Sequence, residues 1–329
     1  MNIKLAILIL IAGSLMGIKP YLLAQTTTPQ KVIIDTDIGD DVDDVFAVGL
    51  ALSSPELDVI GITSAWGETA LRSRMLDRLL CETGRSNIPI STGIKTVSKA
   101  AFSQAVWAQA GPERLHGDAV TFLLDEIRKN PGEITLIAVA PLTNIGAAID
   151  SDPATFKKLK RVVLMGGSIR RGYEASGIGI SQKPEAEYNI AMDSSAAKKL
   201  LQSGVPIYMM PLDSTQLKFD ETKRDMLSTV STPLTDSLQL LIAEWQHATH
   251  NVTPTLFDAV AVAYAIRPDI CPTTPLHLEV DEAGYTREKP GVANANVCLS
   301  SDSGHFFQFL MPRLLDQKLH GSASCIATQ

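Results

Sequence analysis

Short apolar segments alternate with helix-like segments from residue 31 onward, and this alternation limits the possible folds more than any other feature. The segments KVIID (31–35), DVIGITSA (58–65) and EITLIAVA (133–140) are rich in Val, Ile and Leu. Between two of them, RSRMLDRLLCETG (72–84) has apolar residues at helical spacing and ends in a glycine. Strands with near-continuous apolar residues are typical of a parallel sheet that is buried on both faces. The sequence therefore predicts an α/β fold with an open, mostly parallel sheet and helices on both faces.

The rest of the chain continues this alternation without an interruption that would divide it. Residues 235–247, 257–266 and 303–319 are predicted helices, and ANVCL (295–299) is a predicted late strand. No linker rich in Pro, Ser or Gly and no fixed-period repeat separates parts of this region. We therefore predict one domain over residues 26–329.

The first 25 residues have a character of their own. Leu5 to Met16 form an apolar run that follows a lysine and comes before a Thr-rich stretch. This order is typical of a secretory signal peptide, and the run is short for a membrane-spanning helix, which needs about 20 residues. We predict a signal peptide over residues 1–25, a secreted or periplasmic location, and no stable membrane insertion after cleavage. An uncleaved membrane anchor is the alternative.

Charge and cysteine content limit the partners and the kind of metal site. The net charge of −7 and the pI near 5.4 give no basic footprint, so we predict no nucleic-acid partner. The cysteines form no C-x-x-C pair, which argues against a zinc site; they are Cys81, Cys271, Cys298 and Cys325. Four cysteines allow three pairings, among which the sequence does not choose, and we expect at least two of them to be single buried thiols.

Six aspartates occupy the ten positions from Asp35 to Asp44, directly behind a predicted strand. Carboxylates at this density repel one another, and burial beside the strand adds a desolvation cost. A solvated acidic turn is one interpretation. An EF-hand calcium loop is a poor match, because Gly39 and Phe46 occupy the fifth and twelfth positions, where ligands are needed. The third interpretation is half of a site, in which Asp37 and Asp44 bind a hard cation.

Such a half-site needs a further acid from a distant part of the chain, and Asp258 is the candidate. It comes at the start of the apolar helix FDAVAVAYAI (257–266), although capping of that helix would also explain an acid there. Polar clusters also follow other predicted strands, namely PLTN (141–144), MGGS (165–168) and PLDST (211–215). Because ligands bind beyond the carboxyl ends of the strands in open parallel sheets, these clusters indicate one shared site.

Five motifs occur in an order that resembles the nucleoside hydrolase family of the inosine–uridine-preferring type. They are DTDIG with the later DD (35–44), APLTNIG (140–146), VVLMGG (162–167), AEYNI (186–190) and FDAVAVAYAIRPDI (257–270). The resemblance implies a bound calcium ion as cofactor and a ribonucleoside as substrate. It also implies hydrolysis of the N-glycosidic bond to free base and ribose, by direct attack of a metal-bound water.

The resemblance further implies roles for individual residues. Asp37 would bind calcium and take a proton from the attacking water. The other metal ligands would be Asp44, Asp258 and the main-chain carbonyl of Thr143. Substrate contacts would come from Asp43 at a ribose hydroxyl, Glu187 and Asn189 at the 5′ side, Met165 beneath the ribose, and His116 in the pocket. Calcium accepts six to eight oxygen ligands, which suits this set better than the tight octahedron of magnesium.

Departures from the family pattern affect the expected chemistry. Ile38 replaces a proline of the usual aspartate loop, which also has two extra residues here. Asp41 is either a spare acid near the metal or a turn residue, and we favour the turn residue. The role of Glu68, where relatives have a neutral amide, is open. Phe257 replaces a histidine that is a candidate proton donor to the leaving base. Phe257 cannot donate a proton but can stack on the base, so we predict that purine nucleosides are somewhat favoured.

Two alternatives to this enzyme stay open. One is a non-catalytic periplasmic nucleoside-binding protein, and the other is a hydrolase of the same fold that acts on pyrimidine or other ribosides. Retention of Asp37 favours catalysis, because a binding protein gains nothing from a base that activates water. We also expect a homodimer or a homotetramer.

Overall fold

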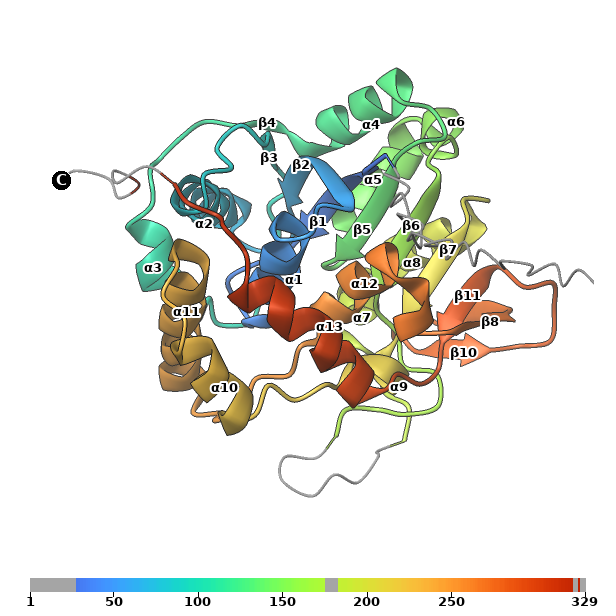
Figure 1. The fold of residues 1–329 in the computed structure, drawn as a ribbon. Coiled ribbons are helices and arrows are strands. Elements are labelled where there is room, and N and C mark those ends of the chain that lie inside the picture. The colour runs from blue at the N-terminus through green and yellow to red at the C-terminus, as the bar shows by residue number, and fades with distance from the viewer. Residues whose placement is uncertain (1–27, 175–182, 322–324, 326–329) are drawn as a thin grey trace, which may run out of the picture.

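A nine-stranded sheet forms the centre of the computed structural model, which describes residues 28–174, 183–321 and 325 (Figure 1). Its strands are β1 (Gln30–Thr36), β2 (Leu57–Ser64), β3 (Ile90–Thr92), β4 (Gly117–Asp118), β5 (Thr135–Val139), β6 (Arg161–Met165), β7 (Ile207–Met210), β8 (Thr273–Leu276) and β11 (Ala295–Cys298). Their order is β4-β3-β2-β1-β5-β6-β7-β11-β8, and every neighbouring pair is parallel except β11 and β8. The predicted mostly parallel α/β sheet is confirmed. The strands β9 (Leu278–Val280) and β10 (Thr286–Glu288) form a separate antiparallel pair.

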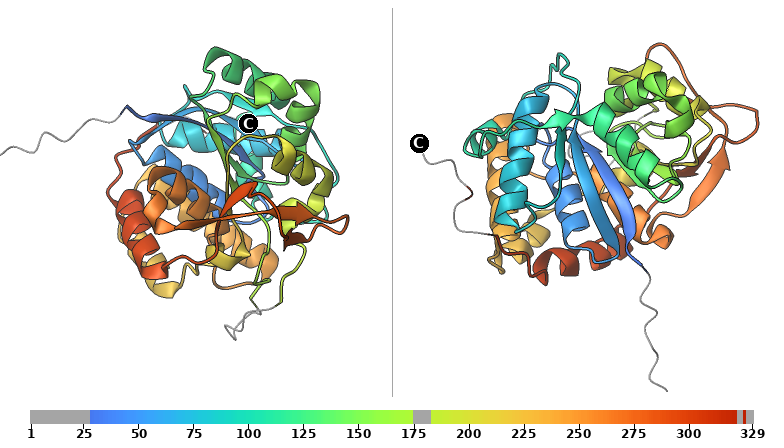
Figure 2. Two further views of the ribbon diagram at one scale, coloured as in Figure 1. Left: turned by 90° about the vertical axis from the view of Figure 1, so that its right-hand side faces the viewer. Right: turned by 90° about the horizontal axis from the view of Figure 1, so that it is seen from above.

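Helices cover both faces of the sheet (Figure 2). One layer shares a core cluster and contains α1 (Asp43–Leu52), α2 (Thr69–Glu82), α3 (Ala105–Gln109), α11 (Pro233–Thr249), α12 (Phe257–Ile266) and α13 (Ser303–Leu315). The other layer shares a second core cluster and contains α4 (Ala119–Lys129), α5 (Thr143–Ser151), α6 (Pro153–Phe156) and α8 (Ser194–Gln202). The remaining helices lie in the connections: α7 (Tyr188–Met192), α9 (Leu212–Thr215), α10 (Glu221–Ser228) and the 3-10 helix η1 (Pro268–Ile270).

The packing of α1 against α12 positions the acidic residues. Both helices are apolar almost all round and are buried on nearly every side. Such helices belong in the middle of a core, and α12 lies over β5 and β6 while α1 lies beside it. Asp43 and Asp44 lie in the first turn of α1, and Asp258 lies in the first turn of α12. Acids in a first turn are also favoured by the helix dipole.

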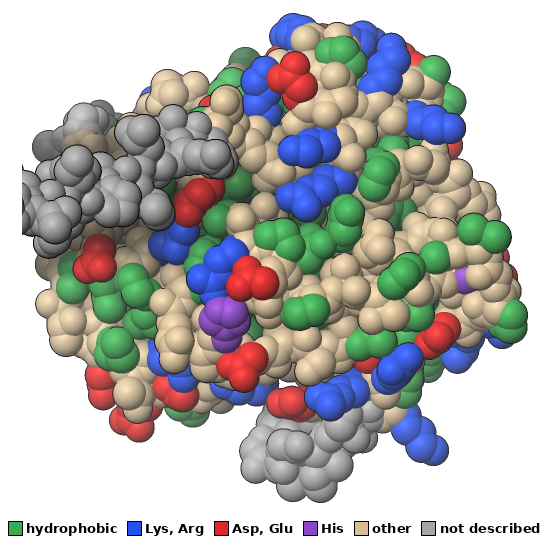
Figure 3. Space-filling model, turned by 45° about the vertical axis from the view of Figure 1, so that its right-hand side comes forward, with side chains coloured by type: hydrophobic (Ala, Val, Ile, Leu, Met, Phe, Trp, Pro, Cys, Tyr) green, Lys and Arg blue, Asp and Glu red, His purple; other side chains and the backbone are tan. Residues whose placement is uncertain are grey.

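The exterior gives less information than the core. On the face drawn in Figure 3, basic and acidic side chains occur among apolar ones. None of the helices in the described ranges is long and apolar enough to cross a membrane. The predicted signal peptide, residues 1–25, lies outside the described residues.

Two disulfide bonds join the four cysteines. Cys81 of α2 pairs with Cys325, and Cys271 after η1 pairs with Cys298 at the end of β11. The Cα–Cα distances are 5.5 and 5.6 Å, within the ordinary range for a disulfide. The expectation of at least two single buried thiols is therefore wrong. The partners are 244 and 27 residues apart, so only the folded chain shows which cysteines meet.

Replacing Cys271 and Cys298 together by alanine is expected to lower the free energy of unfolding by about 2–4 kcal/mol. The bond links residues 27 positions apart, and its removal gives the unfolded chain more conformational freedom. Urea denaturation of the variant and the wild type measures the difference. Because both partners are replaced, no unpaired thiol is left at this position. Equal midpoints would show that the bond does not contribute to stability.

Candidate active site

A cavity of about 370 Å³ lies at the carboxyl ends of the central strands, and its wall is strongly acidic. Seven carboxylates line it, namely Asp37, Asp40, Asp41, Asp43, Asp44, Glu187 and Asp258. No lysine, arginine or histidine is among the described residues of this wall. The volume is in the range of small-molecule sites. The charge of the wall favours a neutral or cationic ligand over an anion such as a phosphate ester.

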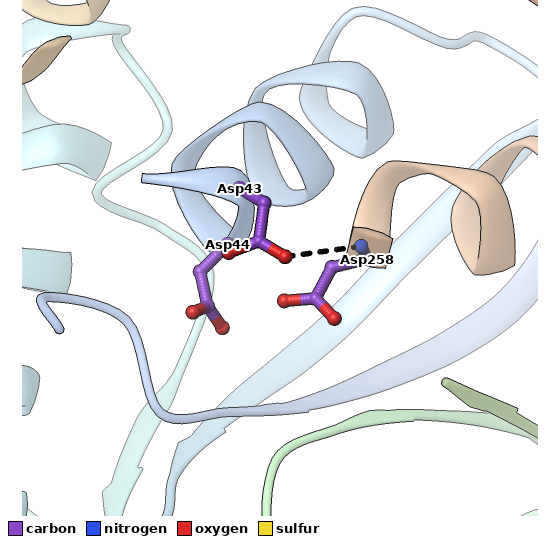
Figure 4. Close-up of side chains that lie close together, drawn as sticks. All are labelled: Asp43, Asp44 and Asp258. Carbon is purple, nitrogen blue, oxygen red and sulfur yellow. Dashed lines mark hydrogen bonds between the residues drawn. The ribbon is translucent and has the colours of Figure 1, made fainter. Parts of the chain in front are cut away.

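Three of the carboxylates lie close enough together to share one metal ion. Oxygens of Asp43, Asp44 and Asp258 lie within 4.8 Å of one another, and all three side chains are buried (Figure 4). The main-chain N–H of Asp258 donates to Asp43 Oδ2 at 3.3 Å, which joins the first turns of α12 and α1. The hydroxyl of Thr36, at the end of β1, donates to Asp44. The strand β1 and the helices α1 and α12 therefore meet at these three side chains, which we call the carboxylate cluster.

Burial and repulsion strongly affect the ionisation of the carboxylate cluster. Burial raises the pKa of Asp43, Asp44 and Asp258 well above the ordinary value, and neighbouring carboxylates raise each pKa further. A divalent cation between them would offset this repulsion. Carboxylate oxygens are the donors that calcium and magnesium prefer, whereas zinc sites are built mainly from Cys and His. The donor set therefore suits a hard divalent cation.

Asp37 lines the same cavity but is not one of the three clustered carboxylates. Burial raises its pKa to about 7, and the nearby positive charge of Arg72 partly opposes this rise. Asp37 was predicted as a metal ligand and Asp43 as a contact of a ribose hydroxyl. In the structure Asp43 is in the cluster, because its helix packs on the helix of Asp258 while Asp37 lies on the loop after β1. A buried acid with a pKa near 7 is a candidate general base.

Another part of the wall carries polar groups in fixed orientations. Glu187 caps α7 and accepts hydrogen bonds from the main-chain N–H groups of Gly167, Asn189 and Ile190 at 2.8, 2.9 and 3.1 Å. Asn189 Nδ2 donates to the carbonyl of Met165 at 3.2 Å. The residues predicted to hold and underlie the sugar, Met165, Glu187 and Asn189, all line the cavity. These hydrogen bonds leave the side chains of Glu187 and Asn189 little freedom.

Four aromatic side chains also line the cavity: Tyr173, Tyr188, Trp245 and Phe257. Phe257 is the first residue of α12 and is half-buried, so it is not simply a core residue. Its ring meets the ring of Tyr173 edge to face, with centroids 6.2 Å apart. Aromatic rings of this kind can stack on a heterocyclic base.

A model of the inosine-uridine preferring nucleoside hydrolase family matches residues 32–308. The chain belongs to this family. The pyrimidine-specific ribonucleoside hydrolase RihA of Citrobacter koseri is 31% identical to it, over 86% of this chain and 97% of that protein. A solved plant nucleoside hydrolase, PpNRh1, is 26% identical with a TM-score of 0.77, over 88% of this chain and 99% of that one. A purine-preferring ribonucleoside hydrolase from Gardnerella vaginalis is 25% identical with a TM-score of 0.73, over 87% and 98%.

Two predicted site residues of this nucleoside hydrolase lie outside the cavity wall. Thr143 is the first residue of α5, and its hydroxyl donates to Asp193 at 2.9 Å. Val139, the last residue of β5, lines the cavity at that strand exit instead. His116 contacts the carboxylate of Asp77 on α2 at 2.7 Å. Neither residue is part of the described wall, and the metal role of the Thr143 carbonyl and the pocket role of His116 stay predictions.

The structure also shows the positions of Asp41 and Glu68, whose roles the sequence leaves open. Asp41 accepts a hydrogen bond from the N–H of Val42 at 2.7 Å, as a turn residue does, and it also lines the cavity. Glu68 forms an exposed ion pair with Lys95 at 2.8 Å and is not part of the wall.

Sequence reasoning missed several residues of this nucleoside hydrolase's cavity wall. They are Asp40, Ala100, Ala101, Val139, Tyr173, Tyr188, Trp245, Thr249 and Asn251. Trp245 and Thr249 are four residues apart on α11, so the helical period could have placed them on one face. No such signal marks Ala100 and Ala101, which lie in the long connection between β3 and α3.

Proposed function

We propose that this nucleoside hydrolase depends on calcium and hydrolyses the N-glycosidic bond of ribonucleosides by direct attack of water. The buried carboxylate cluster of Asp43, Asp44 and Asp258 supports the proposal, because a cation between three carboxylates in one cavity offsets their mutual repulsion. Val139, rather than Thr143, would add a main-chain oxygen. Calcium is favoured over magnesium because it accepts more oxygen ligands in a less regular shell.

Different residues of the cavity have different roles in the proposed reaction. Asp43, Asp44 and Asp258 would hold the cation, which would supply Lewis-acid chemistry by lowering the pKa of water. Asp37 accepts the proton of the attacking water, and its pKa near 7 suits a base that works at neutral pH. Glu187 and Asn189 hold the sugar at its 5′ side. The surrounding carboxylates stabilise the positive charge that develops on the ribose as the base departs. Attack by one water, without an enzyme nucleophile, inverts the anomeric carbon.

The base end of the cavity supports a preference for purines. Phe257 and Tyr173 offer aromatic surface, and a purine presents a larger face for stacking than a pyrimidine. Among the described residues of the wall there is no histidine that could protonate the leaving base. Stacking is therefore the contribution that we assign to Phe257.

Phe257→Ala is expected to lower kcat/KM for inosine by about tenfold or more, since stacking of a base on an aromatic ring is worth about 1–3 kcal/mol. The loss for uridine should be about threefold, because its ring covers less of the side chain. Initial rates with both substrates measure the two losses. Phe257→Tyr retains the ring and is the matched control. Equal losses for inosine and uridine would assign Phe257 to packing.

A substrate panel tests the proposed function. Purified protein is incubated with inosine, adenosine, uridine or cytidine in the presence of calcium, and released ribose is measured as reducing sugar. Release supports hydrolysis, and faster release from the purine nucleosides supports the purine preference. The pyrimidine specificity in the name of RihA favours the alternative that only uridine and cytidine react. Binding measured by calorimetry without any release would instead support a nucleoside-binding protein.

We also propose that the chain is exported and acts as a homodimer or homotetramer. Two disulfide bonds support a secreted or periplasmic location, because disulfides persist in oxidising compartments. Mass spectrometry of the protein from the periplasm or the medium should find a chain that begins near residue 26. Light scattering of the purified protein gives its mass in solution. A cytoplasmic full-length chain would contradict the export proposal.

A further inference from the structure

Arg72, on the first turn of α2, is a fully buried arginine behind the aspartate loop, with 1% of its surface exposed. Nη1 donates to the main-chain carbonyls of Asp37 and Ile38, the latter at 3.0 Å. Nε donates to the carbonyl of Trp66 at 2.8 Å, and Nη2 pairs with Asp40 Oδ2 at 2.8 Å. A buried charge is tolerated only when its hydrogen-bonding groups are satisfied, and here they are satisfied by two loops.

The two loops follow neighbouring strands, β1 and β2. One contains Asp37, and the other contains Trp66, whose φ of 59° is uncommon for a bulky side chain. The indole N–H of Trp66 donates to the hydroxyl of Tyr188 at 3.0 Å, and Tyr188 lines the cavity. Backbone in this region persists only where its surroundings hold it, and the carbonyl of Trp66 is held by Arg72.

The aspartate loop has a particular need for such a restraint. It has Ile38 where the family pattern has a proline, and it contains two extra residues. The loop can therefore adopt more conformations when nothing restrains it. Residues from the connection before α3 hold the far side of the loop. Ser103 Oγ donates to the carbonyl of Asp40 at 2.6 Å, and Gln104 Nε2 donates to the carbonyl of Asp41 at 2.7 Å. The side chain of Arg72 joins this loop to the loop after β2, and the main-chain N–H of Ala65 donates to the carbonyl of Thr36 where the two strands end.

An aromatic ring also packs against the buried guanidinium of Arg72. The ring of Phe102 lies over it, 5.1 Å from the centroid to Cζ. Phe102 also contacts Gly39, whose φ of 122° favours glycine and where an added Cβ would lie 2.2 Å from the ring. The planar fork of arginine meets three carbonyls and one carboxylate together, which the single ammonium of lysine cannot do.

We propose that Arg72 is a positioning residue that fixes the main chain after β1 and β2, so that the Asp37 carboxylate, and Tyr188 held by Trp66, face the substrate. The inference rests on the proposed function, in which Asp37 accepts the proton of water. Misplacement of a reacting group by about 1 Å can lower a rate about 100-fold. Arg72 therefore affects the rate through Asp37, without contact with the substrate.

Arg72→Lys keeps the charge but cannot reach all four acceptors. We expect kcat for ribose release to fall about 100-fold, with KM changed by less than threefold. Arg72→Ala should lose at least as much, and added guanidinium at millimolar concentration should restore its kcat about tenfold, whereas methylammonium should not. Restoration by guanidinium is a result that a purely structural role would not give.

Arg78 of the same helix provides the matched control. It is also buried, its guanidinium lies 4.0 Å from the Trp107 ring centroid, and it donates to the carbonyl of Trp107 and to Glu82, away from the cavity. Arg78→Lys should lower the melting temperature and leave kcat within twofold. A normal kcat in Arg72→Lys, or an equal loss of kcat in Arg78→Lys, would overturn the proposal.

Amide hydrogen exchange provides a readout that does not require activity. Arg72→Lys should speed exchange over residues 37–42 and 65–69, and Arg78→Lys should not. If the wild type released no ribose, the proposed function would fail, while the exchange data would still decide whether Arg72 holds both loops. Unchanged exchange in both segments would overturn the positioning role in either case.

Discussion

Asp37→Asn is expected to lower kcat for ribose release by about 10³-fold, with KM changed by less than threefold. Asparagine has the shape of aspartate but cannot accept a proton from water, and loss of a general base costs about 10²–10⁴ in rate. The variant should fold, because removal of one buried charge from an acidic cavity relieves repulsion. Initial rates with inosine at saturating calcium, together with thermal melting, measure both effects.

Asp41→Asn is the matched control for this prediction. Asp41 lies on the same loop and the same wall, but its carboxylate accepts from Val42 N–H, which an amide oxygen can also do. Its activity should stay within about fivefold of the wild type, because no proton transfer is assigned to it. Retention of more than a tenth of the activity in Asp37→Asn would show that Asp37 is not the base.

The acids that meet at the cavity could be predicted because strong local patterns fix the helices that carry them. DDVFAV follows an apolar strand, and FDAVAVAYAI has no polar residue after its second position. Both therefore predict buried helices that begin at an acid, and the parallel sheet brings such starts to one edge. Which of the acids form the carboxylate cluster could not be predicted in the same way. It depends on the packing of α1 on α12, which brings Asp43, and not Asp37, beside Asp258.

Thr143 and His116 were predicted at the site, but the structure places both outside the described wall of the cavity. The PLTN motif marks a strand exit, but β5 ends at Val139, and the threonine lies four residues further on in a helix, where it contacts Asp193. His116 contacts Asp77 of α2, a residue that no sequence pattern links to it. Contacts between distant segments also decide the disulfide pairing and the convergence of Trp245 with the aspartate loop. These contacts depend on three-dimensional packing, which local patterns do not record.

Removal of calcium is expected to lower the rate of ribose release at least 10³-fold. Without the cation, Asp43, Asp44 and Asp258 repel one another, and no positive charge activates the attacking water. Treatment with a calcium chelator followed by dialysis, and then assay with added calcium or magnesium, measures the dependence. Calcium should restore the rate and magnesium should restore little of it. Full activity after exhaustive chelation would contradict the metal proposal, and Asp258→Asn should reproduce the loss in the presence of calcium.

The proposed calcium ion is expected to stabilise the folded protein, and the same carboxylates should make this stabilisation dependent on pH. Their pKa values in the folded protein lie above those of the unfolded chain, so without the cation the folded state binds more protons and its stability falls as pH rises. For Asp37 this fall extends from about pH 4 to about pH 7. Calcium competes with these protons, so its effect should grow over the same interval. At 100 times its Kd, calcium should add about 2.7 kcal/mol at pH 7.5, or roughly 5 °C in Tm, and much less at pH 5. Calorimetric melting at both pH values measures the change in Tm on addition of calcium. An equal change at pH 5 and pH 7.5 would show that calcium binds elsewhere. A change that persists in Asp258→Asn would show the same.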